Sequence, residues 1–276
     1  MQPEQIQQEL YKEAKAIVKT EPLAKTTLEE QILSRASFAD MLSVTLACQL
    51  AGEVMRRAEL ELLFSNAYRK YPSLISEAIF DLEAVEHRDP ACKSYLEPLL
   101  FFKGFQAIQA YRVAHILWTA GRPFPAKLLQ SIISRKFGVD IHPAAKIGHG
   151  ILMDHATNIV IGETAKVGND VSFLHGVTLG GTGNETGDRH PKIGDGVMLG
   201  AHAQLLGNIH IGRGAKIGAG AVVLDDVPPH TTFAGVPAVR VGRPEDEMPS
   251  LRMQQDFMQD VSKKDGTNSA AGAKQG

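Results

Sequence analysis

Aliphatic residues recur at every sixth position over residues 193–224 of this chain. Glycine follows four of the six positions in this series. The six are Ile193, Leu199, Leu205, Ile211, Ile217 and Val223. A coil with three flat faces needs one inward residue on each face, and glycine where the backbone takes unusual dihedral angles. The period of six therefore predicts a parallel β-helix, with a glycine-rich antiparallel sandwich as the alternative.

The same period continues upstream in two further phases. One phase contains Ile141, Ile147, Met153 and Ile159, and the other contains Ile161, Val167, Phe173 and Leu179. The phase slips by two residues between Ile159 and Ile161, and the step from Leu179 to Ile193 is fourteen residues instead of twelve. Residues 181–191 are polar, rich in glycine and free of aliphatic side chains. They are expected to form a loop that protrudes from the coil.

Before about residue 139 the hydrophobic spacing is helical. We expect helices over residues 28–50, 53–69, 73–86, 105–120 and 126–137. Thr27 and Glu30 have the spacing of a capping box at the start of the first of these helices. Asp89 before Pro90 is typical of the N-cap of a further helix. These helices carry apolar stripes but no catalytic constellation. Residues 1–139 are therefore expected to form a helical oligomerisation domain.

The coil is expected to end at Pro228 and Pro229, after which residues 233–243 fit an extended strand that folds back over the last coil. From Pro244 onward the chain is polar, and its last fourteen residues, KKDGTNSAAGAKQG, are typical of disorder. The predicted division is a helical domain over 1–139, a β-helix domain over 140–243 and a flexible tail over 244–276.

Composition limits the classes of function. The chain has 276 residues, 43% of them hydrophobic and 22% charged, which is ordinary for a globular protein. A net charge of -2, without a long basic run, gives no support for nucleic-acid binding. Cys48 and Cys92 have neither disulfide nor metal-ligand spacing. No signal peptide and no apolar run of roughly 20 residues is present, so we expect a cytoplasmic protein without a membrane segment.

Histidine is concentrated in the repeat region, which holds eight of the ten in the chain. These eight are His142, His149, His155, His175, His190, His202, His210 and His230. A scaffold needs none of them. Three imidazoles at coil corners could bind zinc, and one imidazole backed by a carboxylate could act as a general base. Asp140 and His155 are fifteen residues apart, which in an eighteen-residue coil with a corner is expected to bring them close on adjacent coils.

Two motifs in this region are highly specific. They are LMDHATNIVIGETA, over residues 152–165, and HGVTLGGTG followed by GDRHPKIG, over residues 175–194. In both, the sequence closely resembles serine O-acetyltransferase, and the resemblance extends from about Leu28 to Arg243. It implies an α+β fold with an all-helical N-terminal domain followed by a left-handed parallel β-helix of hexapeptide repeats.

The resemblance assigns roles to individual residues. It implies that His155 is the catalytic base and that Asp140 orients it. The substrate pocket of the family falls on Asp89, Asp154, Arg189 and His190. Coenzyme A would lie along the coil near Gly181, Ala201, Lys216 and Ala219. These roles fit the chemistry, because a serine hydroxyl needs a base and the zwitterion needs both anionic and cationic partners.

The implied reaction transfers acetyl from acetyl-CoA to the hydroxyl of L-serine, giving O-acetyl-L-serine and CoA, the first step of cysteine biosynthesis. The expectation includes no permanent cofactor and no metal, L-cysteine as feedback inhibitor, and trimers that pair into a hexamer. The alternative is a zinc-dependent hydratase on the same scaffold, like the γ-class carbonic anhydrases. Many bacterial members end in an isoleucine that docks into O-acetylserine sulfhydrylase. Gly276 stands here instead, so we expect no tight complex through the tail.

Overall fold

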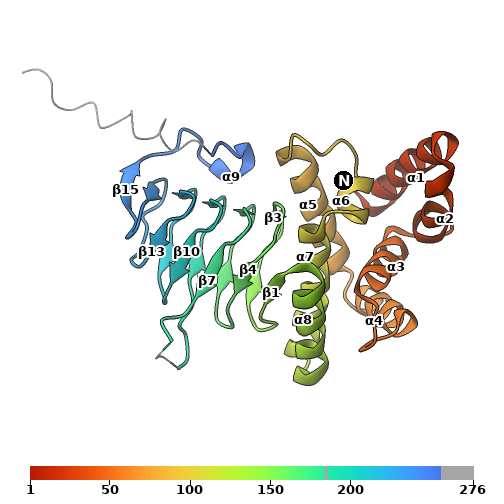
Figure 1. The fold of residues 1–276 in the computed structure, drawn as a ribbon, viewed down its shortest axis with the longest axis horizontal. Coiled ribbons are helices and arrows are strands. Elements are labelled where there is room, and N and C mark those ends of the chain that lie inside the picture. Colours follow the sequence, from red (N-terminus) through yellow and green to blue (C-terminus); the bar gives the residue numbers. More distant parts are fainter. Residues whose placement is uncertain (184–185, 256–276) are drawn as a thin grey trace, which may run out of the picture.

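The computed structural model describes residues 1–183 and 186–255. A helical N-terminal half stacks against one end of a coil of short strands (Figure 1). The helical segments are α1 (Pro3–Thr20), η1 (Pro22–Ala24), α2 (Lys25–Leu28), η2 (Glu29–Leu33), α3 (Phe38–Leu50), α4 (Arg57–Lys70), α5 (Ser73–Arg88), α6 (Leu96–Leu100), α7 (Lys103–Thr119), α8 (Pro123–Phe137) and, after the coil, α9 (Pro249–Arg252). Among the described helices, none is both long enough and apolar enough to cross a bilayer.

Fifteen strands of two to four residues build three sheets in the described part of the chain. The first sheet is β1 (Val139–Ile141), β4 (Ile159–Ile161), β7 (Thr178–Gly180), β10 (Gln204–Leu206) and β13 (Val222–Val223). The second is β2 (Lys146–Ile147), β5 (Lys166–Val167), β8 (Lys192–Ile193) and β11 (His210–Ile211). The third is β3 (Leu152–Met153), β6 (Ser172–Phe173), β9 (Met198–Leu199), β12 (Lys216–Ile217), β14 (Thr232–Ala234) and β15 (Val239–Gly242).

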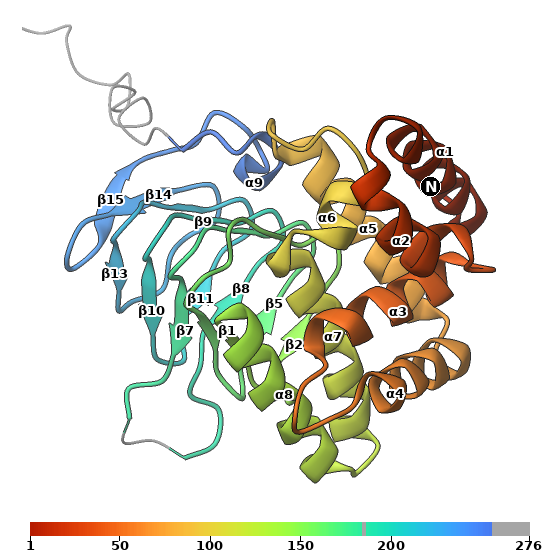
Figure 2. The same cartoon turned by 45° about the vertical axis from the view of Figure 1, so that its right-hand side comes forward.

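Successive strands fall on successive sheets, so the chain winds as a three-sided parallel coil (Figure 2). The expected β-helix is confirmed. The predicted end of the coil at Pro228 and Pro229 is wrong, because β14 follows the two prolines and still pairs parallel with β12 in the third sheet. A fold-back does form, but it begins only at β15, which pairs antiparallel with β14, and is not one strand over 233–243. The hexad residues point inward. Phe173, Leu179, Leu199 and Leu205 are all 0% exposed.

The register explains both interruptions of the period. Residue 160 pairs with residue 178 and residue 204 with residue 222, which are eighteen-residue coils. Residue 139 instead pairs with residue 159, and residue 152 with residue 172, so these coils take twenty residues. The two extra residues lie between β3 and β4. A twenty-six-residue coil links residue 178 to residue 204, and it contains the predicted loop between Gly180 and Lys192.

Two of the predicted helix starts are wrong. Thr27 lies inside α2, and the next long helix begins only at Phe38, where the Ser37 hydroxyl accepts from the backbone N–H of Asp40 at 3.1 Å. Asp89 ends α5 instead of starting a helix. Its Oδ1 accepts from the N–H of Ala91 at 2.8 Å, which is the side-chain turn that aspartate favours outside helices.

The described part of the predicted tail is not a free segment. Helix α9 packs on the third sheet, where Ser250 is 0% exposed. The Ser250 hydroxyl donates to the carbonyl of Asp170 at 2.5 Å, and the Ser172 hydroxyl donates to the carbonyl of Ser250 at 2.9 Å. The expectation of flexibility is therefore wrong for residues 249–252. The rest of the tail, including Gly276, lies outside the described residues.

A buried ion pair joins the helices to the first coil. Arg112 of α7 donates through Nη2 to Oδ2 of Asp81 in α5 at 2.6 Å, and both side chains are almost fully buried. The other oxygen of Asp81 accepts from the N–H of Ile151 at 2.8 Å, and Arg112 Nη2 also reaches the carbonyl of Gly148 at 2.8 Å. Because both ions bond to the backbone just before β3, they fix the coil against α5 and α7.

Replacing Asp81 with Ala should therefore lower the free energy of unfolding by about 3–5 kcal/mol, because Arg112 would stay buried without its main partner. Urea unfolding monitored by circular dichroism measures this loss. Glu59→Ala removes an exposed partner of Arg56 and serves as the control. An unchanged midpoint for Asp81→Ala would show that the ion pair does not hold the junction.

Candidate active site

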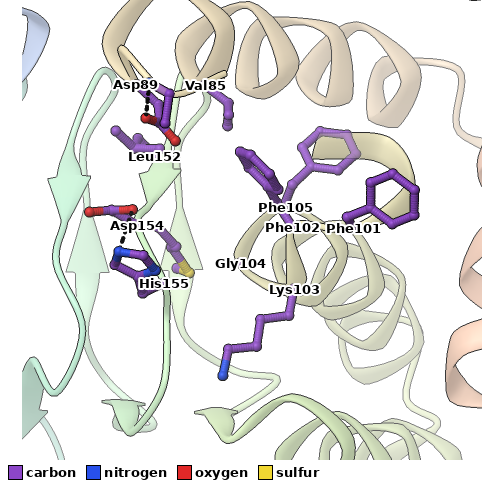
Figure 3. A pocket seen from close by; sticks show the side chains of 12 residues that line it. Val85, Asp89, Phe101, Phe102, Lys103, Gly104, Phe105, Leu152, Asp154 and His155 are labelled. Atoms are coloured by element: carbon purple, nitrogen blue, oxygen red, sulfur yellow. Dashed lines mark hydrogen bonds and ion pairs between the residues drawn. The ribbon is translucent and has the colours of Figure 1, made fainter. Parts of the chain in front are cut away.

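A cavity of about 310 Å³ lies where α5, α7 and β3 meet (Figure 3). Its lining residues are Val85, Asp89, Ala91, Phe101, Phe102, Lys103, Gly104, Phe105, Leu152, Met153, Asp154 and His155. A second hollow shares Asp89, Asp154 and His155 and extends to Arg252 and Met253 of the C-terminal segment. The structure thus brings together three of the predicted site residues: Asp89, Asp154 and His155.

The corner after β3 projects His155 from the coil. His155, Ala156 and Asn158 all have positive φ values, of 54°, 57° and 61°. Non-glycine residues rarely adopt this left-handed conformation, and such residues cluster at functional sites. The corner also holds the two extra residues of the twenty-residue coils. The His155 side chain is 79% exposed, so the irregular corner presents it to whatever enters the cavity.

Two carboxylates line the cavity together with this histidine. Asp154 Oδ1 is 3.8 Å from His155 Nε2. Burial raises the pKa of Asp154, the charge of His155 opposes that rise, and the nearby Asp89 carboxylate adds to it. Two negative groups in a partly apolar cavity favour a bound cation, because a cation offsets both the burial and the repulsion. The ammonium group of an amino acid has the required charge.

Lys103 is a pocket residue that the sequence reasoning missed. Its Nζ donates to Oγ1 of Thr157, two residues after His155, and so connects α7 to the corner. The adjacent Gly104 permits this approach, since a Cβ there would lie 2.0 Å from the carbonyl oxygen of Met153. The sequence held one sign of this role, because a lysine and a glycine interrupt the phenylalanine-rich run Phe101–Phe105. The predicted helix began only at residue 105, after both residues.

Asp140 does not reach His155 within one chain. It lies on β1 opposite Val160, and its Oδ1 accepts from Nε2 of Gln130 at 2.7 Å. The expected proximity assumed an eighteen-residue coil. Because this coil has twenty residues, a step of fifteen stops at the preceding corner. The predicted proximity of Asp140 and His155 is therefore wrong for a single chain.

Arg189 and His190 lie at the base of the protruding loop, on a different part of the coil. Arg189 Nη2 pairs with Glu163 Oε2 at 2.7 Å. The N–H groups of Arg189 and His190 both donate to the hydroxyl of Thr164, at 3.0 and 3.1 Å. His190 packs directly over Gly162, where a Cβ would lie 2.0 Å from its ring. The loop base is thereby held rigidly against β4.

The electrostatics link this loop base to Asp140. Burial lowers the pKa of His142; Glu163 and Asp140 raise it, while Lys127 and Arg189 lower it further. Burial and the charges of Arg189 and Lys192 also lower the pKa of His190. One chain therefore carries two groups. The base group is Asp89, Asp154 and His155, and the loop group is Asp140, Arg189 and His190.

The residues expected to bind coenzyme A lie farther along the coil. Ala201 and Ala219 stack at one corner, where the N–H of Gly220 donates to the carbonyl of Ala201 at 2.8 Å. Gly181 lies beside Arg189, whose carbonyl oxygen would be 3.4 Å from an added Cβ. Lys216 is 3% exposed, and its Nζ donates to Oε1 of Gln254 at 3.0 Å. In this structure the C-terminal segment covers Lys216, the cation that was expected to contact coenzyme A.

Three histidines line up along one corner of the coil. The ring centroids of His155 and His175 are 6.3 Å apart, and those of His175 and His202 are 4.8 Å apart, both edge to face. Within residues 1–183 and 186–255, no group of three or more His, Cys, Asp or Glu side chains is arranged to hold a metal ion. The three-histidine set that a zinc hydratase requires does not form there.

Comparison with known proteins gives consistent matches. Residues 6–110 match the family model "Serine acetyltransferase, N-terminal", and residues 190–225 match "Bacterial transferase hexapeptide (six repeats)". The chain is 52% identical over 245 residues to serine acetyltransferase of Escherichia coli, covering 89% of this chain and 90% of the relative.

Solved structures agree with the sequence matches. Serine acetyltransferase of Vibrio cholerae superposes with a TM-score of 0.91 at 49% identity, covering 93% of this chain and 99% of the other. The soybean enzyme, solved with serine, gives a TM-score of 0.84 at 53% identity, covering 86% and 97%. Other similar serine acetyltransferases were solved with cysteine and with CoA.

Replacing Asp154 with Asn should stabilise the free protein at neutral pH. The folded-state pKa of Asp154 lies above its ordinary value of 3.8. The wild type therefore loses stability as the pH rises through the folded pKa, whereas an amide has no charge to lose or gain. Melting temperatures between about pH 3 and pH 8 should show a gap that grows with pH and closes in acid. Asp225→Asn, on an exposed corner, should show no such trend, and a pH-independent gap for Asp154→Asn would contradict the burial argument.

Proposed function

Because the chain belongs to the serine acetyltransferase family, we propose that its cavity beside His155 is the place where serine is acetylated. The enzyme transfers the acetyl group of acetyl-CoA to the hydroxyl of L-serine, and O-acetyl-L-serine and CoA are the products. The observation that carries the assignment of the site is the convergence of Asp89, Asp154 and His155 on one cavity. The zinc hydratase alternative is not supported, because the matched relatives are serine acetyltransferases.

His155 is the general base of the reaction. A serine hydroxyl is a weak nucleophile at neutral pH, so the imidazole removes its proton as the oxygen attacks the thioester carbonyl. The tetrahedral intermediate then collapses, the C–S bond breaks, and the proton on His155 passes to the departing thiolate. The exposed position of His155 on a projecting corner suits this role, since both substrates must reach the ring at once.

Asp89 and Asp154 bind the serine ammonium. Both carboxylates line the cavity, and burial makes the charged form of Asp154 unfavourable when the cavity holds no cation. A bound ammonium would relieve that penalty. The carboxylate of serine then needs a positive partner, which Arg189 supplies in a bidentate geometry with His190 beside it.

The base group and the loop group come from neighbouring copies of the chain. Asp140 and Arg189 lie on parts of the coil away from the His155 cavity, so one chain cannot complete the site. In a trimer of parallel coils, the corner of one copy faces the sheet of the next, which places Asp140, Arg189 and His190 of a second copy against His155. The helical domain, residues 1–139, then pairs two trimers into a hexamer.

Coenzyme A would bind along the coil near Gly181, Ala201 and Ala219, with Lys216 toward its phosphates. Lys216 is buried in this structure and donates to Gln254, so the C-terminal segment would have to uncover it for that contact to form. L-cysteine would compete with serine for the same groups, because it differs only in carrying a thiol for the hydroxyl. A similar serine acetyltransferase was solved in complex with cysteine, which supports the binding of cysteine.

Replacing His155 with Asn should lower kcat by roughly a hundredfold or more and leave acetyl-CoA affinity nearly unchanged, since general-base catalysis typically contributes 10² to 10⁴. Steady-state assays with thiol detection measure kcat, and calorimetry measures CoA binding. His210→Asn alters an exposed histidine elsewhere on the coil and should behave as wild type. Near wild-type turnover in His155→Asn would assign the base to another group.

Mixing two strongly impaired variants should restore activity. Mixed trimers of His155→Asn and Asp140→Asn contain some interfaces at which an intact His155 faces an intact Asp140, about a quarter of them in a random mixture. Co-expression with two affinity tags isolates mixed oligomers, whose rate is then measured. His155→Asn mixed with Asp154→Asn is the matched control, because both changes lie in the base group. No recovery in mixed oligomers of the first kind would place the complete site within one chain.

A further inference from the structure

Gln130 of α8 holds the carboxylate that the proposed mechanism places beside the base. Its Nε2 donates to Oδ1 of Asp140 at 2.7 Å, and both side chains are half-buried. Helix α8 ends at Phe137, Gly138 takes a left-handed conformation with φ of 67°, and β1 starts at Val139. The chain therefore reverses through a single residue. This reversal lays Gln130 of α8 against Asp140 of β1.

The surroundings of this hydrogen bond form a polar cleft of about 350 Å³. The lining residues are Lys127, Gln130, Ser131, Ser134, Arg135, Asp140 and His142. Two cations line the cleft, yet the hydrogen bond to Oδ1 comes from a neutral amide. An amide fixes the plane of a carboxylate without cancelling its charge, whereas a close cation would weaken the field that the carboxylate exerts on an imidazolium.

We propose that Gln130 is a positioning residue for acetyl transfer, which occupies Oδ1 of Asp140 and turns Oδ2 toward the imidazole of the base. The inference rests on the role given to Asp140 in the proposed function. An aspartate behind a catalytic histidine works by holding one tautomer and stabilising the charged ring, and both effects depend on its orientation. Without Gln130, the Asp140 carboxylate rotates about its last bond and presents Oδ2 to the ring only part of the time.

The test is a double-mutant cycle. Gln130→Met removes the amide donor and keeps the length of the side chain. It should lower kcat by roughly 10- to 100-fold, with KM for serine and for acetyl-CoA within about twofold of wild type. In an Asp140→Asn background the same change should have no further effect, because Gln130 acts only through that carboxylate. A merely structural role would reduce the rate in both backgrounds.

Matched variants keep the test decisive. Ser134→Ala alters the same cleft without touching Asp140 and should leave kcat unchanged. Gln130→Glu keeps size and polarity but puts a second negative charge beside Asp140, and it should lose at least as much turnover as Gln130→Met. Circular dichroism and the mass in solution confirm that each variant folds and assembles.

The outcomes separate this inference from the proposed function. A normal kcat for Gln130→Met and Gln130→Glu, with an impaired Asp140→Asn, would overturn the positioning role alone. Equal losses in the wild-type and Asp140→Asn backgrounds would also overturn it. A fully active Asp140→Asn enzyme would remove the role of Asp140 and this inference together.

Discussion

The register between successive turns of the coil is the constraint on which the rest of the structure depends. Each inward aliphatic residue must lie over its equivalent one turn earlier, and eighteen residues per turn meet that condition. The chain departs from eighteen between β3 and β4, where two extra residues form the corner of His155, and between β7 and β8, where the loop of Arg189 leaves the coil. His155 and Arg189 thus lie where the repeat is broken, whereas Asp140 lies on the regular strand β1 and Asp89 at the end of α5.

The helical domain forms most of the cavity wall, since eight of the twelve lining residues lie before residue 139. Asp89 ends α5, and the preceding Arg88 is 7% exposed. Arg88 donates to the carbonyl of Gly150 and to Oδ1 of Asp170, both at 2.9 Å. Together with the buried pair of Asp81 and Arg112, these bonds leave α5 little freedom relative to the coil. The distance between the carboxylates of Asp89 and Asp154 is therefore set by a polar junction that carries no chemistry itself.

The β-helix could be predicted from the sequence because its period of six relates residues that are close together in the chain. The loop, both phase slips and the grouping of Asp154 with His155 follow from counting. Counting did not place Asp140 correctly relative to His155, because the two extra residues fall in the corner that carries His155 and lengthen that coil to twenty residues. Lys103 and Gln130 were missed for a related reason. Each contacts a residue remote in sequence, Thr157 and Asp140 respectively. Lys103 had one local signal, its place beside Gly104 in a run of phenylalanines, whereas Gln130 is a polar residue on an otherwise ordinary helix and had none.

The proposed division of the site between two copies has an electrostatic rationale. A pocket for a zwitterion needs two carboxylates and one guanidinium within a few ångströms, and in a single chain these groups would pair with each other and exclude the substrate. Here Glu163 holds Arg189 at 2.7 Å, away from the cavity that contains Asp89 and Asp154. The hydrogen bond from Arg189 is the first cause that lowers the pKa of Glu163, which fits a carboxylate paired with that guanidinium. In the proposed assembly, the two groups would meet only when copies associate, and serine, rather than a neighbouring side chain, would complete the pairing between them.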